Sequence, residues 1–378
     1  MITREKADIL ALFEDAKSKS AFVNVAAPMV RYSKLEFRSL LRRHNVQLCF
    51  TPMITADTFS NSPSARFSEF STNSTDSPVI AQFAAKKTVD LLKATEIIAP
   101  YVDGVDINCG CPQSWAIAKG YGCGLLKNPE LMSDMVQTLR RNFSSKMSIS
   151  VKIRLLNHED FKTTVELARR MESSGVSFIT LHGRTPYSKP ADPVIHNGIK
   201  VVKDSLRIPL IGNGNVKSFE DAREMFQKTN CDGVMAASGL LTNPSLFDDE
   251  GMTSLECIQD WVNIASSAKD NLQFNTFHHH LTFMLEKQMK SKTRVLFNNF
   301  TKKEEVFGFL EENFGVKAED KDCLEEYFDF SSDDRYMNSR AVEREKIQLW
   351  DEKKEGKFFK EFMEKEEEEE EGLGFLYE

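Results

Sequence analysis

The sequence predicts a (β/α)8 barrel, because eight short apolar runs alternate with helical segments over about 230 residues. Polar residues and glycines follow most of these runs, at the carboxyl ends where barrel enzymes build their sites. A doubly wound open sheet is the structural alternative, although it usually needs fewer strands. The expected strands are residues 21–27, 47–51, 79–84, 104–107, 148–153, 176–181, 210–211 and 233–235.

Helical spacing of apolar residues fills the intervals between these strands. Pro129 suits the first residue of a helix, Gly175 is expected to close one, and Ser218 to cap another. The expected helices of the barrel are residues 35–44, 89–99, 129–143, 161–173, 195–204 and 218–227. A further helical pattern covers residues 252–285, with predicted core positions at Trp261, Ile264, Phe277 and Leu281.

The chain is long enough for a large domain of about 250 residues and a smaller one. We expect the barrel over residues 1–250, a helical domain over 251–330 and an acidic tail over 331–378. Residues 343–378 contain fourteen Asp or Glu and seven Lys or Arg, so residues 1–342 carry a net charge of only −1. An anionic partner would therefore be held by local patches of cations. The unbroken run of glutamates at 366–371 is expected to be disordered or a frayed helix.

The sequence predicts a soluble intracellular monomer, located in the cytoplasm, the nucleus or both. Its first residues lack the apolar core of a signal peptide, and no run approaches the ~18 apolar residues of a membrane helix. Seven cysteines without framework spacing indicate free thiols in a reducing compartment. No metal is expected, because Cys109, Cys111 and Cys123 form no Cys-x-x-Cys pair and have no fourth ligand nearby.

The stretch at 105–112 (Val-Asp-Ile-Asn-Cys-Gly-Cys-Pro) organises the predicted site. Its apolar run ends in Asn108, two thiols, a glycine and Pro112, which cannot continue a strand. Side chains therefore leave the strand at its carboxyl end, and glycines at 120, 122 and 124 suggest that the loop folds closely over something. Taken alone, the stretch is more simply an ordinary strand-to-helix turn with a buried cysteine.

Polar groups stand at the ends of the other predicted strands as well. They are Pro28-Met29, Gln82, Lys152 with Arg154, His182-Gly183-Arg184, Gly212-Asn213-Gly214 and residues 236–239 (Ala-Ala-Ser-Gly). The glycine-rich ends of strands seven and eight suit a phosphate held by backbone N–H groups. Each signal is weak singly, since Gly-x-Gly arises by chance and a lone histidine is more often a satisfied core residue. Together they predict a site for a phosphate-bearing cofactor.

Six ordered motifs carry a family resemblance. They lie at residues 27–30 (Ala-Pro-Met-Val), 108–112 with 119–126, 151–154 (Val-Lys-Ile-Arg), 181–185 (Leu-His-Gly-Arg-Thr), 211–216 and 239–244. These motifs resemble those of the dihydrouridine synthases, flavin enzymes that reduce uridine in tRNA. The resemblance runs from about residue 21 to about residue 315. The Cys-Gly-Cys-Pro version, the short second domain and residues 294–298 look most like the fourth eukaryotic class.

The resemblance implies FMN as the hydride carrier, NADPH or NADH as its reductant, and tRNA as the substrate. It implies that Cys111 is the acid that protonates uracil C5, and a thiol with a reference pKa of about 8.5 is mostly protonated at neutral pH. Lys152 would stabilise negative charge at the pyrimidine edge of the flavin, where Gln82 also lies. The other implied FMN contacts are Pro28 and Met29 on the ring, His182 beside the ribityl-phosphate, and Asn213, Gly214, Asn215, Ala237, Ser238 and Gly239 around the phosphate.

One residue departs from the family pattern. Members usually carry arginine before the glycine of the last motif, and this chain has Ser238. A serine hydroxyl can donate one hydrogen bond to phosphate, but it cannot form the bidentate contact of a guanidinium. Either FMN is held more weakly here, or Lys217 or another cation compensates.

The expected contacts with tRNA are mostly basic. The resemblance places Asn108 near the uracil, and we expect Arg154 and Arg184 at the mouth of the site. Six cations follow in the helical domain with no acid between them: Lys287, Lys290, Lys292, Arg294, Lys302 and Lys303. They are either a solvated face or a patch for the phosphate backbone. A second candidate cluster is Arg31, Lys34, Arg38, Arg42 and Arg43.

The three histidines at 278–280 do not predict a metal site, because consecutive helical residues point about 100° apart. We expect them at the surface or partly buried. Two other functions stay open: a dihydroorotate dehydrogenase-like flavoenzyme acting on a free pyrimidine, and an inactive RNA-binding protein. The basic helical domain argues against the first, and Cys111, Lys152 and His182 argue against the second. The class resemblance suggests positions 20a and 20b of the D-loop as the target.

Overall fold

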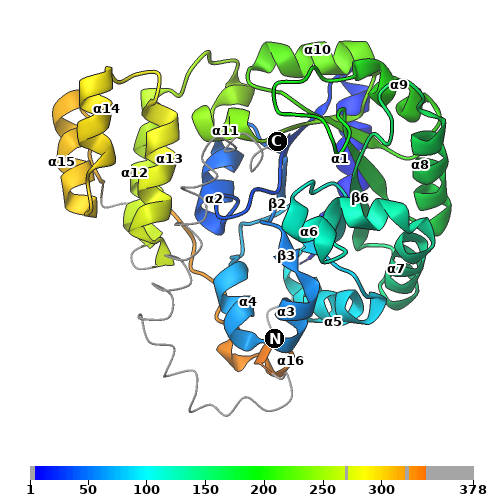
Figure 1. Cartoon of the computed structure of the whole chain (residues 1–378). Helices are drawn as coiled ribbons and strands as arrows, with labels where there is room; N and C mark the ends of the chain where they lie inside the picture. The colour runs from blue at the N-terminus through cyan, green and yellow to red at the C-terminus, as the bar shows by residue number, and fades with distance from the viewer. Residues whose placement is uncertain (1–4, 269–270, 320–322, 338–378) are drawn as a thin grey trace.

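The computed structural model describes residues 5–268, 271–319 and 323–337 (Figure 1). Within them, eight parallel strands close into the predicted barrel, because β1 pairs with both β2 and β9, and β2 pairs with β4. The barrel strands are β1 (Val23–Ala26), β2 (Leu48–Phe50), β4 (Val79–Ala84), β5 (Gly104–Asn108), β6 (Ser148–Arg154), β7 (Phe178–His182), β8 (Leu210–Asn213) and β9 (Gly233–Ala236). The two-residue strand β3 (Ile54–Thr55) adds a short pairing to the end of β4.

Several predicted site residues belong to the strands and not to the loops after them. The strands β5, β6, β7 and β8 run one or two residues further than predicted and end at Asn108, Arg154, His182 and Asn213. In the register of the sheet, His182 stands between Arg154 and Asn213. Arg154, His182 and Asn213 are therefore level with one another at the carboxyl end of the barrel, whereas Asn108 is level with Lys152. Gln82 lies deeper, level with Asp106.

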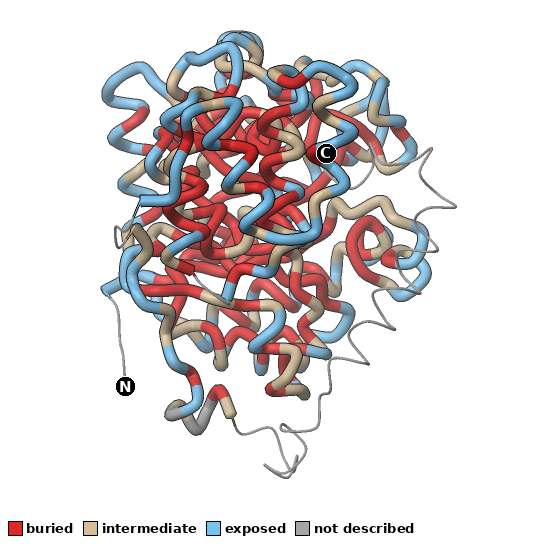
Figure 2. The backbone as a smooth tube through the Cα atoms, turned by 90° about the vertical axis from the view of Figure 1, so that its left-hand side faces the viewer, coloured by how far each residue is buried: buried red, intermediate tan, exposed pale blue. Residues whose placement is uncertain are grey.

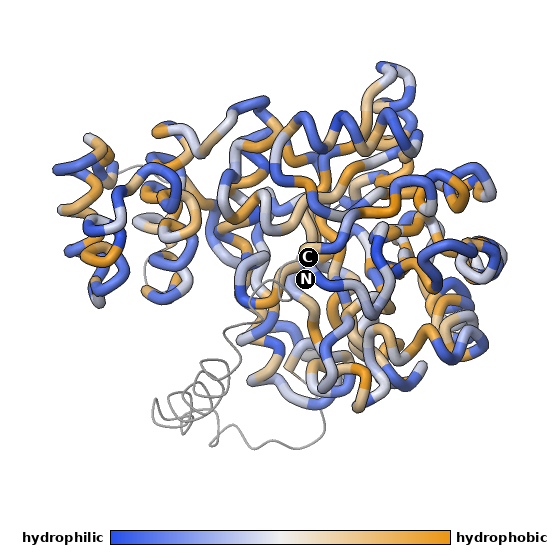
Figure 3. The backbone as a smooth tube through the Cα atoms, turned by 45° about the horizontal axis from the view of Figure 1, so that its top comes forward, coloured by the Kyte–Doolittle hydropathy of each residue, from blue (hydrophilic) through white to orange (hydrophobic). Residues whose placement is uncertain are grey.

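The predicted helices surround the barrel and leave its strands buried (Figure 2). Figure 3 shows hydrophobic segments through the middle of the barrel and recurring hydrophilic stretches along the surrounding helices. The predicted helix boundaries at Ser218 and Gly175 are confirmed: Ser218 caps the start of its helix by accepting from the Asp221 backbone, and Gly175 ends its helix with a φ of 102°. The barrel helices are α1 (Ile9–Ser18), α2 (Leu35–Arg43), α5 (Thr88–Ile98), α6 (Ser114–Ala118), α7 (Pro129–Asn142), α8 (Lys162–Ser174), α9 (His196–Asp204), α10 (Phe219–Thr229) and α11 (Ser238–Thr242).

A helical domain stands beside the barrel and packs on α2 and α11 (Figure 1). It consists of α12 (Leu255–Ala268), α13 (Phe274–Leu285), α14 (Ser291–Asn298) and α15 (Lys303–Phe314). All four core positions predicted for its first two helices are buried. Across the 5–268, 271–319 and 323–337 ranges, no helix has the length and apolarity that a membrane span needs.

The expectation for the three histidines is wrong at two of them. His278 and His280 are buried, and only His279 is exposed. The ring of His280 stacks on Phe37 of α2 with 4.1 Å between centroids and meets Trp261 edge-on. Burial lowers the pKa of His280 to about 3, so the ring is neutral and behaves as an aromatic side chain at the domain interface. In the described ranges, no group of three or more His, Cys, Asp or Glu is placed to hold a metal ion.

The chain returns to the barrel after the helical domain, beyond the boundary predicted at residue 330. Phe330 and Tyr336 are buried and stack on one another at 4.2 Å, close to α3 (Ala56–Asn61) and α4 (Pro63–Glu69). The short helix α16 (Asp334–Met337) lies beside α4 in Figure 1, and the Tyr336 carbonyl accepts from Arg66. Residues 331–337 are therefore part of the folded body, whereas 338–378, including the glutamates at 366–371, lie outside the described residues.

Three of the five cations in the second candidate basic cluster are paired with carboxylates of the folded body. Arg38 is 1% exposed and makes a hydrogen-bonded ion pair of 2.5 Å with Asp76, which is also buried. Arg42 pairs with the other oxygen of Asp76 at 3.1 Å. Arg43 binds Asp260 of α12 at 2.7 Å. These cations neutralise buried or interfacial carboxylates, a pairing that sequence spacing alone did not reveal.

Candidate active site

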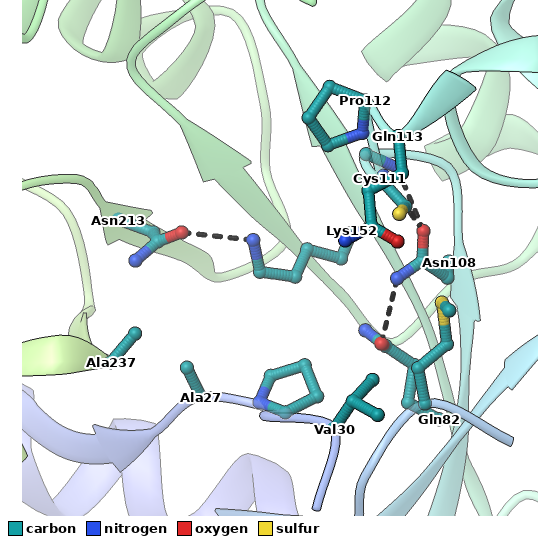
Figure 4. Close-up of a pocket in the computed structure, with 13 residues that line it drawn as sticks. Ala27, Val30, Gln82, Asn108, Cys111, Pro112, Gln113, Lys152, Asn213 and Ala237 are labelled. Atoms are coloured by element: carbon teal, nitrogen blue, oxygen red, sulfur yellow. Dashed lines mark hydrogen bonds between the residues drawn. The ribbon is translucent and has the colours of Figure 1, made fainter. Parts of the chain in front are cut away.

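A cleft opens at the carboxyl end of the barrel, where the sequence predicts the site (Figure 4). Its empty volume is ≈ 650 Å³, the open solvent at its mouth included. The lining residues are Ala27, Pro28, Val30, Met53, Gln82, Asn108, Gly110, Cys111, Pro112, Gln113, Lys152, Asn213 and Ala237. Seven of them are predicted site residues, drawn from β4, β5, β6, β8 and the loops after β1, β5 and β9.

The loop that carries Cys111 is held from several directions. The side-chain oxygen of Asn108 accepts from the backbone nitrogens of Gly110 at 3.2 Å and Cys111 at 3.0 Å. The carbonyl of Cys111 accepts from the Cys123 nitrogen at 2.9 Å. At Gly122, φ is +54° and a Cβ would stand 2.6 Å from the Cys111 carbonyl oxygen, so only glycine allows this close approach. The thiol is therefore presented to the cleft by a well-anchored loop.

The geometry separates Cys111 from its two neighbouring thiols. Cys109 is fully buried in the core, and Cys123 is buried behind the loop, whereas Cys111 lines the cleft. Burial raises the pKa of the Cys111 thiol, against the opposing effects of a hydrogen bond with the Gln113 backbone and of the cations Arg154 and Lys152. The thiol is consequently protonated at neutral pH and able to donate.

Lys152 of β6 supplies a buried cation to the cleft. Its Nζ donates to the side-chain oxygen of Asn213 at 2.9 Å (Figure 4), and the Asn213 amide nitrogen donates to the Met235 carbonyl at 3.0 Å. Burial, together with the nearby Arg154, lowers the pKa of Lys152 to about 8. The ammonium therefore remains mostly charged at neutral pH, in a site where a charge acts strongly.

His182 is buried next to this group, and neither of its ring nitrogens has a hydrogen-bond partner within the described residues. Burial and the cations Arg154, Lys152 and Arg184 hold its pKa well below the usual range. The neutral ring thus keeps one donor and one acceptor unused, which is costly unless a ligand satisfies them. Gly214 lies against this ring at a φ of +136°, and a Cβ there would stand 3.1 Å from the His182 Cδ2.

The two segments predicted to hold a phosphate come together. A Cβ at Gly239 would stand 2.2 Å from the Val216 carbonyl oxygen and 3.0 Å from the Lys217 Cα, so this glycine packs against the loop that follows β8. Ala237 and Asn213 from these two segments line the cleft. Gly214, Asn215, Ser238 and Gly239 are their immediate neighbours in the chain, and Lys217 is exposed beside them.

Three predicted site residues have positions that differ from the expectation. Met29 is 1% exposed and belongs to the core, and its neighbours Pro28 and Val30 line the cleft in its place. Arg184 is 2% exposed and donates to the carbonyls of Asp192 at 2.8 Å and Pro190 at 2.7 Å. Arg154 is also buried and bridges the carbonyls of Gly110 and Thr185. Both arginines therefore brace loops at the mouth and do not present a free guanidinium to RNA.

Asp106 is not among the predicted site residues, although it lies within the stretch that organises the site. Its buried carboxylate accepts from Gln82 at 2.9 Å and from Ser150 at 2.6 Å. The Gln82 oxygen in turn accepts from the Asn108 amide at 2.8 Å (Figure 4). The available signal was a charged residue inside an otherwise apolar strand, which rarely occurs without a partner.

The predicted RNA-binding cations lie in the helical domain, outside the cleft. Lys287, Lys290 and Lys292 are exposed. Arg294 is partly exposed and approaches Glu286 at 3.7 Å, so some of its charge is balanced. Lys302 is exposed as well, so four of the six predicted cations are exposed, and Lys287, Lys290 and Lys292 lie near the junction of α13 and α14.

Comparison with known proteins agrees with this geometry. Residues 25–332 match the family described as dihydrouridine synthase (Dus). The chain belongs to the dihydrouridine synthase family. It is 43% identical over 312 residues to a human protein named tRNA-dihydrouridine(20a/20b) synthase [NAD(P)+]-like, a match that covers 82% of this chain and 96% of the human one. Over 316 residues it is 38% identical to the tRNA-dihydrouridine(20a/20b) synthase [NAD(P)+] of Schizosaccharomyces pombe, covering 83% of this chain and 94% of the relative.

Proposed function

We propose that this dihydrouridine synthase reduces uridines 20a and 20b in the D-loop of tRNA to 5,6-dihydrouridine, with FMN as cofactor and NADPH or NADH as reductant. The target positions and the nicotinamide reductant follow from the names of the relatives from human and Schizosaccharomyces pombe. The observation that carries the proposal is the position of the Cys111 thiol, which an anchored loop presents to a cleft that also contains the Lys152 amino group.

The residues in and around the cleft fit FMN on four counts. The neutral ring of His182 has one unused donor nitrogen and one unused acceptor nitrogen; a ribityl hydroxyl could satisfy either, and a phosphate oxygen could accept from the N–H. Gly214 and Gly239 leave the backbone free of side chains where the two phosphate-binding segments meet. Lys152 supplies a buried cation to the cleft, and this cation would stabilise negative charge on a bound flavin. Pro28 and Val30 offer an apolar wall for the ring system.

When bound, FMN supplies the hydride for C6 of uracil after its reduction by NADPH or NADH. The chain supplies the rest. Cys111 holds a proton at Sγ for C5 of the base, and its raised pKa keeps that proton in place until the carbon has gained electron density. Asn108 lies between Gln82 and the Cys111 loop, where its amide can also orient the uracil. The buried arginines Arg154 and Arg184 donate hydrogen bonds to backbone carbonyls and so hold the surrounding loops around the cleft.

A flavin spectrum and a substrate comparison test this proposal. The purified protein should be yellow, and its flavin should be reduced by NADPH and reoxidised by tRNA that lacks dihydrouridine. Free uracil and orotate should not reoxidise it, because the base alone lacks the contacts of the helical domain. Reoxidation by orotate at a rate similar to that by tRNA would point to a free-pyrimidine oxidoreductase instead. Absence of any flavin after addition of FMN would contradict the assignment of the cleft.

A further inference from the structure

Asp106 is a buried ionisable group that the reaction above does not use. It lies in the middle of β5, and its side chain is 0% exposed beneath the cleft. One carboxylate oxygen accepts from the Ser150 hydroxyl at 2.6 Å, and the other accepts from the Gln82 amide at 2.9 Å. Burial, against these two hydrogen bonds and the charge of Lys152, raises the pKa of Asp106 to about 6. At neutral pH it is therefore still mainly a carboxylate, which can only accept.

This acceptor sets the direction of a hydrogen-bond chain that ends at Cys111. Because Asp106 only accepts, Gln82 must turn its amide nitrogen toward it and its oxygen toward Asn108. Asn108 then donates to Gln82 at 2.8 Å and turns its own oxygen toward the backbone N–H groups of Gly110 and Cys111. Those N–H groups can only donate. Both ends of the chain thus require the same orientation of the two amides.

We propose that Asp106 is a positioning residue for the reduction. Through Gln82 and Asn108 it fixes the loop that presents the Cys111 thiol to the cleft. This inference rests on the proposed function, because it assigns Cys111 the role of proton donor. Without the carboxylate, the Gln82 nitrogen loses its buried acceptor and the amide can rotate, so Asn108 is no longer held in the orientation that anchors Gly110 and Cys111.

Three matched variants separate positioning from a merely structural role. Asp106→Leu removes both acceptor oxygens and replaces the carboxylate with an apolar side chain of similar size. Asp106→Asn keeps an oxygen for Gln82 and can donate to the Ser150 hydroxyl, and Ser150→Ala removes only the bond to the other carboxylate oxygen. Misplacement of a reacting group by about 1 Å can lower a reaction rate roughly 100-fold. We therefore expect Asp106→Leu to slow the reduction of uridine in tRNA by about 10- to 100-fold. Asp106→Asn should recover most of the rate, and Ser150→Ala should stay near the wild type.

Hydrogen exchange of the Gly110 and Cys111 amides gives a readout that needs neither tRNA nor turnover. Both amides should exchange faster in Asp106→Leu and near the wild-type rate in Asp106→Asn and Ser150→Ala. Should Asp106→Leu fail to fold, Gln82→Met cuts the same chain one link further along and must accelerate the same two amides. Unchanged exchange in a folded Asp106→Leu or Gln82→Met variant would overturn the inference. Failure of the wild type to form dihydrouridine, by contrast, would refute the proposed function and leave the exchange result intact.

Discussion

The side-chain oxygen of Asn108 lies 3.0 Å from the backbone nitrogen of Cys111. This bond joins the last residue of a barrel strand to the residue that carries the thiol, so the position of the proton donor is set by the rigid sheet. Burial raises the pKa of the same thiol. Position and protonation state together suit Cys111 to general acid catalysis, in which the donor must be close and still protonated.

Replacement of Cys111 with alanine should stop the transfer of the proton without removing the cofactor. General acid catalysis typically contributes about 10²- to 10⁴-fold, so we expect a loss of that size in dihydrouridine formation. Reduction of the bound flavin by NADPH should keep its rate, since that half-reaction needs no proton for uracil. Stopped-flow absorbance measures both half-reactions in one sample. A loss of less than tenfold in the rate of dihydrouridine formation would indicate that another residue is the proton donor.

The two neighbouring thiols serve as matched controls. Cys109 and Cys123 are buried away from the cleft, and burial raises the pKa of each thiol, that of Cys123 to about 12. Alanine at either position should change the stability slightly and the rate of uridine reduction little. If Cys109→Ala lost as much activity as Cys111→Ala, the choice within the Cys-Gly-Cys pair would be wrong.

Restoring arginine at Ser238 should tighten the binding of FMN. Ser238 stands beside Gly239, where the two predicted phosphate-binding segments meet, and a charge-assisted contact exceeds a neutral one by roughly 1 kcal/mol. The expected change is therefore about fivefold to tenfold in the dissociation constant. Flavin retained after dialysis measures it. A Lys217→Ala variant tests compensation, and a greater loss of flavin there than in the wild type would show that Lys217 already replaces the missing guanidinium.

The exposed cations of the helical domain should contribute salt-dependent affinity for tRNA. Replacing Lys287, Lys290 and Arg294 together with alanine should weaken binding and flatten its dependence on salt, because fewer counterions are released. Reduction of the flavin by NADPH should be unaffected. The measurement is tRNA binding at two salt concentrations.

A charge-matched control separates this patch from a general effect of net charge. Lys17, Lys93 and Lys146 are exposed on the barrel, and their replacement with alanine removes the same total charge. We expect that control to bind tRNA almost as the wild type does. Equal salt slopes for the two triple variants would refute a specific role for the residues of the helical domain.

His44 should make the stability of the domain interface depend on pH. Burial alone would lower its pKa, but Asp260, Cys257 and Asp248 outweigh burial and raise the pKa to about 11. The contribution of a protonated His44 is then complete below the unfolded pKa of about 6.5 and is lost as the pH rises through about 11. The difference in unfolding free energy between the wild type and His44→Gln should therefore shrink between pH 7 and pH 10. A difference that stays constant over this range would contradict a charged His44.

Alternation of apolar runs was sufficient to predict the barrel, because each strand and its helix obey local rules of spacing and capping. The same rules could not predict the pairing of distant charges. Arg38 and Arg42 read as a basic face in the sequence, yet both neutralise Asp76, more than thirty residues away. The final segment was also missed, since Tyr336 becomes buried only through contact with Arg66 and the aromatic residues around it.

Sequence motifs were sufficient to predict which residues belong to the candidate site. They were less informative about the direction in which each side chain points. Cys111, Lys152 and Asn213 all line the cleft. Arg184 was expected at the mouth of the site because its charge suits RNA, but its guanidinium donates hydrogen bonds to carbonyl groups of its own loop. Asp106 had no assigned role, because nothing in the sequence shows that its partners are Gln82 and Ser150.

Mapping of dihydrouridine in tRNA tests the central claim most directly. Cells that lack this protein should carry unmodified uridine at positions 20a and 20b, and the wild-type chain should restore dihydrouridine at both positions. The Cys111→Ala chain, present at the same level, should not restore it. Dihydrouridine that persists at both positions in the absence of the protein would contradict the proposed function.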